Sequence, residues 1–456
     1  MKVKNPFGND YAELILPNNT NVLHMLSPEV VKNPKKYILS SLENPIDTPP
    51  LSSLARLKIQ KDPAATACII VSDNTRPVPY KGDEGILLPI IRILLEAGFR
   101  TEKILVIVAT GTHRTMRQNE LEDMIDPAVF NLGIKVINHD CEDSSVLSFK
   151  GITSRGTQIY INKYYMEADL KIATGLVESH FMAGASGGRK AVCPGLIGKA
   201  STFVFHGPAF MDHPNSRDLI IEGNPVHEES LEVAKAVGVD FLVNVTLNHA
   251  FHITGVFSGD LEKAHFAAVE KIKESVNIKI DKEADIVITH GGFVGINHYQ
   301  CAKSAVAALG ALKENGYLII IADLKDRGNI VGSINYRTTL ALLKLQGYKN
   351  FLKVIMSSDW SFIPEQWQVQ MWAKVFKKIP MEHLLFFAPQ LEDACWPGLP
   401  GIDAGKFVKN KKQPDCFTKA VIGALAFVEK QNGVKLDNLD IAFIQEGPYS
   451  VPMKKG

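Results

Sequence analysis

KIATGLVESHFMAGASGGRKAVCPGLIGKASTFVFH, residues 171–206, is the stretch on which the predicted fold depends. It begins with an apolar run that we expect to be a strand ending near Thr174, continues through a glycine-rich turn and closes on an expected helix. Glycine lets the backbone adopt positive φ angles and approach a ligand closely. The basic side chain of Lys190 in this setting predicts a site for a phosphorylated or carbonyl-bearing ligand. The stretch alone equally fits a plain strand–turn–helix connection with a solvated lysine.

The turn lacks two common nucleotide-binding motifs. Arg189-Lys190-Ala191 does not have the Gly-Lys-Ser/Thr ending of a Walker A loop. The turn also lacks G-x-G-x-x-G with an acidic residue about twenty positions later, which a Rossmann NAD site requires. A conventional NAD-dependent dehydrogenase is therefore disfavoured.

The composition is ordinary for a globular protein, with 46% hydrophobic and 22% charged residues. A chain of 456 residues exceeds one ordinary core, so two α/β domains are expected. The net charge of +1 gives no basic excess for nucleic acid or an anionic membrane. We find no secretory signal and no apolar run long enough to span a bilayer. The six cysteines form no C-x-x-C pair, which favours a reduced cytoplasmic enzyme over a zinc ribbon or disulfide framework.

From about Ala65 onward, predicted strands, loops and helices alternate along the sequence. Continuous apolar runs at 67–72, 103–109 and 169–174 predict strands, and residues 82–98 have helical spacing. Such strands alternating with helices indicate a largely parallel sheet covered on both faces, and hence the α/β class. Further elements are expected as strands at 241–245 and 253–257 and a helix at 261–275.

Each of the first three strands ends in a polar loop, and these loops contain Arg76, His113 and His180 respectively. Ligands bind at the carboxyl edge of open α/β sheets, so we expect the three side chains to converge on one crevice. Any single loop residue is as easily explained by the general polarity of loops. The three together favour a binding site.

A second α/β unit is expected from about residue 282. It contains strands at 284–289, 317–322 and 384–388 and a helix at 299–313. Tyr299 and Lys303 are four positions apart and share one face of that helix.

The tail of the chain follows an expected hinge at 398–401. A helix at 416–429 and a strand at 439–444 are predicted to return to the first domain. The predicted domains are therefore 1–278, completed by 412–456, and 282–405.

Taken in order, a set of short motifs resembles the nickel-pincer lactate racemase family. The set covers residues 65–370 and consists of Asp73-Asn74-Thr75-Arg76-Pro77, Gly111-Thr112-His113, Glu178-Ser179-His180, Gly187-Gly188-Arg189-Lys190, His206, Tyr299-Gln300-Cys301-Ala302-Lys303 and Gln366-Trp367-Gln368. The resemblance implies two α/β domains with an active-site cleft between them. It also implies nickel held by a pyridinium-3,5-bisthiocarboxylic acid mononucleotide that is tethered to a protein lysine.

The resemblance also implies roles for individual residues. His113 and His180 would be the catalytic acid–base pair, Lys190 the tether of the cofactor and His206 the nickel ligand. Substrate contacts would come from Arg76, Tyr299, Gln300 and Lys303. The cofactor would be contacted by Asp73 and Trp367, and its phosphate by Ser186, Gly187, Gly188 and Arg189.

Chemistry supports this interpretation. Removing a proton from C2 of a 2-hydroxy acid gives a dianion, whereas removing hydride gives a 2-keto acid. No side chain accepts hydride, so a cofactor must do so. A base on each side of the substrate suits both enantiomers, and imidazole titrates near neutral pH. One imidazole would complete a square-planar nickel site whose other ligands come from the cofactor.

Alternatives concern the substrate and the role of the scaffold. The substrate is lactate first, or else malate, an aromatic or longer aliphatic hydroxy acid or a sugar acid. A non-catalytic cofactor-binding protein is disfavoured because both His113 and His180 are present. His227 with Glu228 and Glu229 suggests a divalent-metal site less than it suggests the first turn of a helix. Expected partners are the small substrate and the enzymes that build the cofactor, and the sequence does not fix the oligomeric state.

Overall fold

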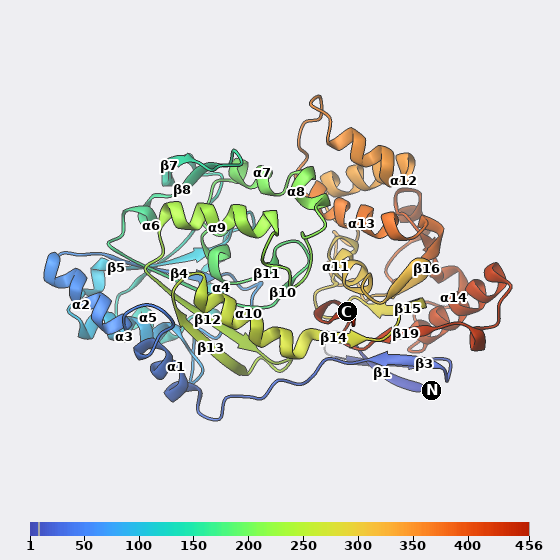
Figure 1. The fold of residues 1–456 in the computed structure, drawn as a ribbon, viewed down its shortest axis with the longest axis horizontal. Coiled ribbons are helices and arrows are strands. Elements are labelled where there is room, and N and C mark those ends of the chain that lie inside the picture. The colour runs from blue at the N-terminus through green and yellow to red at the C-terminus, as the bar shows by residue number, and fades with distance from the viewer. Residues whose placement is uncertain (8–9, 456) are drawn as a thin grey trace. The chain divides into compact units, whose positions relative to one another are not determined.

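The computed structural model describes residues 1–7 and 10–455 (Figure 1). The chain divides into two compact units. We call the unit made of Ser27–His206 and Pro214–Glu274 the N-unit. The unit made of Met1–Leu26, Gly207–His213 and Ser275–Gly456 is the C-unit.

The N-unit is built on a six-stranded sheet with the order β13-β12-β9-β4-β5-β6. All neighbours are parallel except β12 and β13, which are antiparallel. The predicted strands are confirmed, and the second begins one residue later than expected because Lys103 lies in a 3-10 turn. The strands are β4 (Ala67–Ser72), β5 (Ile104–Ala109), β6 (Lys135–Asn138), β9 (Leu170–Leu176), β12 (Phe241–Leu247) and β13 (Ile253–Gly259).

Strand periodicity determines which side chains meet the helices. Ile69 and Val71 of β4 belong to one buried cluster together with Ile90 and Leu94 of α3 (Leu87–Glu96). The same cluster includes residues of α1 (Pro34–Glu43) and α2 (Leu51–Lys61). β4 is apolar from Ala67 to Val71 because both faces of this central strand are buried there.

The C-unit contains a second six-stranded, wholly parallel sheet with the order β18-β17-β16-β15-β19-β3. Its helix α14 (Cys416–Asn432) packs on one face, and α11 (His298–Ala308) contacts β15 and β16. The predicted α/β class is therefore confirmed for both units. The strands are β3 (Thr20–Leu23), β15 (Ala284–His290), β16 (Leu312–Ile321), β17 (Leu384–Phe387), β18 (Ile402–Asp403) and β19 (Ile441–Ile444).

The predicted domain boundaries need correction at both ends of the chain. The segment 412–456 was expected to complete the first domain, but β19 lies between β15 and β3 in the C-unit sheet. Ile441 pairs with Ile286 on one side and Thr20 on the other. Residues 1–26 join the C-unit for the same reason, because β3 needs the exposed edge of β19 as its partner. Local sequence patterns identify strands but not their neighbours.

The end of the stretch 171–206 also differs from expectation. In place of one helix it forms β10 (Ser179–His180), β11 (Gly184–Ala185), the 3-10 turns η3 (Gly188–Ala191) and η4 (Lys199–Ser201), and the short helix α7 (Thr202–Phe205). Positive φ angles at Gly184, Gly187 and Gly188 prevent a regular helix there.

The other elements complete the two units. In the described part of the chain, no helix is both long and apolar enough to cross a bilayer. The main remaining elements are β1 (Lys2–Phe7), β2 (Asp10–Ile15), α4 (Gln118–Met124), α5 (Pro127–Asn131), β7 (Leu147–Ile152), β8 (Gln158–Asn162), α6 (Lys163–Glu167), α8 (Pro208–Asp212), α9 (Pro225–Val237), α10 (Lys263–Val276), β14 (Asn277–Ile280), α12 (Ile334–Ile355), α13 (Gln366–Lys378) and β20 (Val451–Lys454).

Candidate active site

Strand order brings three predicted site loops to one edge of the N-unit sheet. β4 lies between β5 and β9, and the three strands are parallel. Arg76 follows the central strand β4, His113 follows β5 and His180 follows β9. The order of the strands therefore gives the arginine loop a histidine loop on each side.

Asp73 and His113 form a carboxylate–imidazole pair. Asp73 Oδ2 lies 2.7 Å from His113 Nδ1, and Oδ1 accepts hydrogen bonds from the Thr75 hydroxyl at 2.6 Å and the Thr75 N–H at 3.2 Å. Burial by itself raises the pKa of Asp73, but its hydrogen bonds and the His113 charge outweigh burial and hold the pKa below the ordinary value.

The ionised Asp73 carboxylate therefore holds the ring hydrogen of His113 on Nδ1. The lone pair is then on Nε2 of a side chain that is 58% exposed, whereas the Asp73 side chain is 6% exposed. Both carboxylate oxygens are engaged within the protein, which favours an orienting role for Asp73 over the predicted cofactor contact.

His180 is held in a different way. Its Nδ1 accepts hydrogen bonds from the N–H groups of Met182 at 3.2 Å and Ala183 at 3.1 Å. In the neutral ring the hydrogen is therefore on Nε2. That atom lies 3.3 Å from Lys190 Nζ.

Gly187 and Gly188 shape the turn that carries Lys190. Their φ angles are +72° and +53°. A Cβ on Gly187 would lie 3.0 Å from Asn244 Oδ1, and a Cβ on Gly188 would lie 2.6 Å from His265 Cγ. The turn therefore requires glycine at both positions. The Gly188 N–H donates to Asn244 Oδ1 at 2.9 Å, so it is already engaged.

The predicted phosphate contacts of Ser186 and Arg189 are directed to the main chain instead. The Ser186 hydroxyl donates to the carbonyl of Leu176 at 2.7 Å. The Arg189 guanidinium donates to the carbonyls of Ala185 at 2.9 Å and Ala183 at 2.7 Å. These bonds stabilise the loop and do not support the expected phosphate cradle.

His206 ends the short helix α7. Its Nδ1–H donates to the carbonyl of Thr202 at 2.9 Å. Burial lowers the pKa of His206 to about 4; the Thr202 carbonyl raises it, and the charge of nearby Lys190 lowers it. The imidazole is thus neutral at pH 7 with its lone pair on Nε2, the form that binds a metal.

A metal at His206 would need donors from outside the protein. Among the described residues, no three His, Cys, Asp or Glu side chains gather as a metal site. His206 therefore fits a metal that takes its other ligands from an organic cofactor.

Arg76 is half-buried beside the Asp73–His113 pair. The main-chain N–H of Arg76 donates to the main-chain carbonyl of Asp73 at 3.2 Å, which fixes the turn after β4. No salt bridge joins its guanidinium to a carboxylate in the described residues. A planar guanidinium in this position is suited to binding a substrate carboxylate.

In the C-unit, two further predicted residues meet. Trp367 Nε1–H donates to the Tyr299 hydroxyl at 3.0 Å, and Gln368 donates to the Tyr299 carbonyl at 2.7 Å. Burial raises the pKa of Tyr299, and the charge of Glu365 raises it further. The phenol therefore stays protonated and keeps its hydrogen for a further acceptor.

Gln300 and Lys303 lie on the same helix α11 and are half-buried. Gln300 Oε1 is buried without a hydrogen-bond partner among the described residues. His298, the preceding residue, is a core side chain: its Nδ1 lies 2.8 Å from the Tyr336 hydroxyl, and its ring stacks on Trp372 at 4.8 Å.

The sequence did not reveal the residues that orient this site. Asn244 holds the Gly188 N–H, and the Thr202 carbonyl holds His206. The contact with Thr202 could have been predicted from the sequence, because a side chain at a helix end can reach the carbonyl four residues earlier. The contact with Asn244 could not, because Asn244 lies on a strand far away in the sequence.

Comparisons with known proteins cover both units. A family model described as the lactate racemase N-terminal domain matches residues 7–218, and one described as the lactate racemase C-terminal domain matches residues 279–387. Lactate racemase of Thermoanaerobacterium thermosaccharolyticum is 32% identical over 356 residues, or 76% of this chain and 79% of that protein. Lactate racemase of Lactiplantibacillus plantarum is 34% identical over 362 residues, or 79% of this chain and 80% of that protein.

Comparison with solved structures also finds a lactate racemase. The lactate racemase apoprotein from T. thermosaccharolyticum superposes with a TM-score of 0.83 at 26% identity, over 99% of this chain and all of that one. A protein from Thermotoga maritima matches with a TM-score of 0.58 at 16% identity, over 89% of this chain and 97% of that one, which shows a similar fold only.

Proposed function

Since the chain belongs to the lactate racemase family, and is thus an isomerase, we propose that it interconverts the two enantiomers of a small 2-hydroxy acid. Lactate is the first substrate to test, because both curated relatives are named for it. One observation carries the proposal: loops on both sides of Arg76 each present an imidazole whose Nδ1 is fixed by hydrogen bonds. A racemase needs such groups on both sides of the reacting carbon.

The chemistry of the substrate determines the route. Loss of a proton from C2 would place a second negative charge beside the carboxylate. Loss of hydride instead gives a neutral carbonyl at C2, and return of hydride to the opposite face inverts the centre without net oxidation. When bound, a nickel-pincer nucleotide would supply the hydride acceptor that side chains lack.

The residues of the chain handle the carboxylate and the hydroxyl. Arg76 binds the substrate carboxylate through its planar guanidinium. His113 accepts the hydroxyl proton at Nε2, and the Asp73 carboxylate stabilises the imidazolium that forms. His180 serves the hydroxyl of the other enantiomer from the opposite side. To accept that proton at Nε2, the His180 ring must first carry its hydrogen on Nδ1.

Two residues are suited to hold the cofactor. His206 offers a neutral Nε2 lone pair for nickel. Lys190 Nζ lies 3.3 Å from His180 Nε2. Once it has lost its proton, this amine would be the nucleophile needed for a covalent tether.

The family resemblance assigns the remaining substrate and cofactor contacts to Tyr299, Gln300, Lys303 and Trp367. The protonated Tyr299 phenol supports a role as a donor to the substrate carboxylate or to the developing oxyanion. We further propose a reducing, cytoplasmic setting, which is compatible with six free thiols. Cofactor-building enzymes would be the partners in that setting.

The test is direct. The full chain, produced together with the cofactor-building enzymes, should convert D-lactate to L-lactate and the reverse, as measured by chiral chromatography. A panel with malate, longer aliphatic, aromatic and sugar hydroxy acids would identify the preferred substrate. No conversion of any of these by protein that contains nickel would contradict the proposal.

A further inference from the structure

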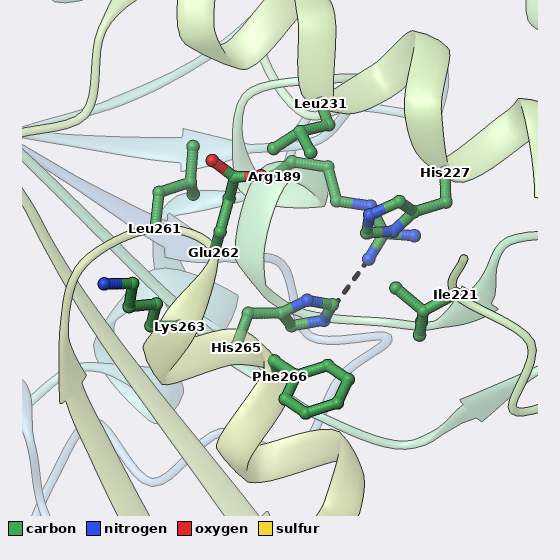
Figure 2. A pocket seen from close by; sticks show the side chains of 9 residues that line it. All are labelled: Arg189, Ile221, His227, Leu231, Leu261, Glu262, Lys263, His265 and Phe266. Atoms are coloured by element: carbon green, nitrogen blue, oxygen red, sulfur yellow. Dashed lines mark hydrogen bonds between the residues drawn. The ribbon is translucent and has the colours of Figure 1, made fainter. Parts of the chain in front are cut away.

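A cavity of about 320 Å³ lies within the N-unit, on the side of the η3 turn that Arg189 faces (Figure 2). None of His113, His180, Lys190 and His206 lines it. The cavity is lined by Arg189, Ile221, His227, Leu231, Leu261, Glu262, Lys263, His265 and Phe266.

The cavity is lined by a buried cation, Arg189, that forms no salt bridge with a carboxylate of the described residues. Arg189 is 1% exposed, and its two terminal nitrogens donate to main-chain carbonyls. Nη1 also lies 3.3 Å from His265 Nε2, the contact dashed in Figure 2, and Nε has no hydrogen-bond partner among the described residues. Burial of an unpaired charge is costly, so a cation in this position favours an anion in the adjoining space.

A second unpartnered group lies beside Arg189. His227 is 8% exposed, and its Nδ1 also has no partner in the described part of the chain. The rings of His227 and His265 are nearly parallel, with centroids 6.1 Å apart. The two imidazoles flank the guanidinium in Figure 2. His265 Nε2 is already bonded to the Ser186 carbonyl at 2.9 Å, which leaves Arg189 and His227 for a ligand.

The other walls are mainly apolar, and the charges at the rim are compensated. Glu262 pairs with Lys235 at 2.6 Å, and Lys263 pairs with Asp47 at 2.5 Å. The net field in the cavity therefore comes from Arg189. Apolar walls are supplied by Ile221, Leu231, Leu261 and Phe266.

We propose that this cavity binds a small organic carboxylate. Its carboxylate group pairs with the Arg189 guanidinium and accepts a hydrogen bond from His227, while its hydrocarbon body packs on Leu231, Leu261 and Phe266. Inorganic phosphate would leave those apolar walls without a partner. Because Arg189 and Lys190 are adjacent in the η3 turn, the ligand contacts the turn that presents the proposed tether.

The experiment is a calorimetric titration of the full chain, without cofactor, with butanoate, which has no 2-hydroxyl group. Leu231→Trp fills the cavity, and Arg76→Ala removes the proposed carboxylate contact at the other site. We expect Leu231→Trp to weaken butanoate binding by about tenfold or more and Arg76→Ala to change it by less than about twofold. Unchanged binding by a folded Leu231→Trp protein, or loss of binding in Arg76→Ala, would overturn the proposal.

Three further measurements test whether the carboxylate binds in this cavity. His227→Phe preserves the size of the ring and should also weaken butanoate binding if Leu231→Trp does not fold. A crystal soaked with 4-bromobutanoate should show bromine among Leu231, Leu261 and Phe266. Binding of inorganic phosphate without butanoate, or loss of butanoate binding once the cofactor is loaded, would mean that the cavity serves a phosphate instead.

Discussion

His113 and His180 are both expected to act on the hydroxyl group, yet the protein holds them in opposite ways. His113 donates a hydrogen bond from Nδ1–H to the buried Asp73 carboxylate, so its Nε2 carries a lone pair. His180 accepts two main-chain N–H groups at Nδ1, so its Nε2 carries the hydrogen. One ring is prepared to accept a proton and the other to donate a hydrogen bond.

The difference arises from the loops. The turn after β4 places a carboxylate next to the β5 loop, whereas the segment after β9 folds back on itself and surrounds His180 with its own N–H groups. A carboxylate stabilises an imidazolium, while two N–H donors disfavour one. The two halves of a symmetric reaction are therefore supported by chemically unlike groups.

The largest effect should come from removing either ring. The equilibrium constant of a racemisation is one, so steady-state kcat/KM falls equally in both directions and does not separate the two histidines. Formation of the 2-keto acid from each enantiomer, trapped by rapid quenching, does separate them. We expect His113→Ala to slow this step by about 10²- to 10⁴-fold for one enantiomer and His180→Ala to slow it for the other. Equal slowing of both enantiomers by each variant would refute the two-sided arrangement.

A smaller effect is expected from Asp73→Asn, which keeps the shape but removes the charge that stabilises the His113 imidazolium. We expect about a 10²-fold loss in the half-reaction that depends on His113, and little change in the other. Comparison with Thr112→Ser, a neutral change in the β5 loop that carries His113, controls for packing. If both half-reactions fall together, Asp73 is not specific to His113.

Asp73→Asn should also change the pH dependence of stability. Asp73 has a lowered pKa in the folded chain, so the stabilisation that it provides is fully present above the unfolded value of about 3.9. It is lost as the pH falls through the lower folded pKa. The difference in unfolding free energy between wild type and Asp73→Asn should therefore shrink below about pH 4 in denaturant titrations.

The conformation of the Lys190 turn can be tested with matched glycines. Gly188→Ala adds a Cβ 2.6 Å from His265 at φ +53°, and we expect a loss of about 2–5 kcal/mol. Gly82→Ala, at φ +74° with nothing within 4 Å, should cost only about 1 kcal/mol. Equal unfolding free energies for the two variants would show that contact with His265 does not restrain the turn.

The smallest effect should follow Thr75→Val, which removes the hydroxyl at 2.6 Å from Asp73 Oδ1. We expect a loss of about 1 kcal/mol and a rise in the pKa of Asp73, visible as a shift of its carbon resonance in NMR titrations. An unshifted titration would mean that the Thr75 hydroxyl does not contribute to lowering that pKa.

Much of the fold could be predicted from periodicity. Apolar runs such as 67–72 coincide with a strand because both of its faces are buried, and the helix over 416–429 is confirmed as α14. The tail was misassigned because pairing of β19 with β3 joins residues more than 400 positions apart. No local pattern encodes such a partner.

The candidate site likewise has features that the sequence predicted and features that it did not. The family resemblance assigned His180 and Lys190 to one active site, and the structure places their Nε2 and Nζ atoms 3.3 Å apart. It did not predict that Arg189 is buried with its hydrogen bonds directed to the main chain. Hydrogen-bond direction depends on loop folding, which residue types alone do not determine.

We propose that hydride, rather than a proton, leaves C2 of the substrate between the two imidazoles. The most direct measurement is the conversion of D-lactate deuterated at C2 in ordinary water, followed by mass spectrometry of the L-lactate formed. If hydride leaves, the deuterium stays at C2 in the product. Replacement of deuterium by solvent hydrogen at the rate of racemisation would contradict it.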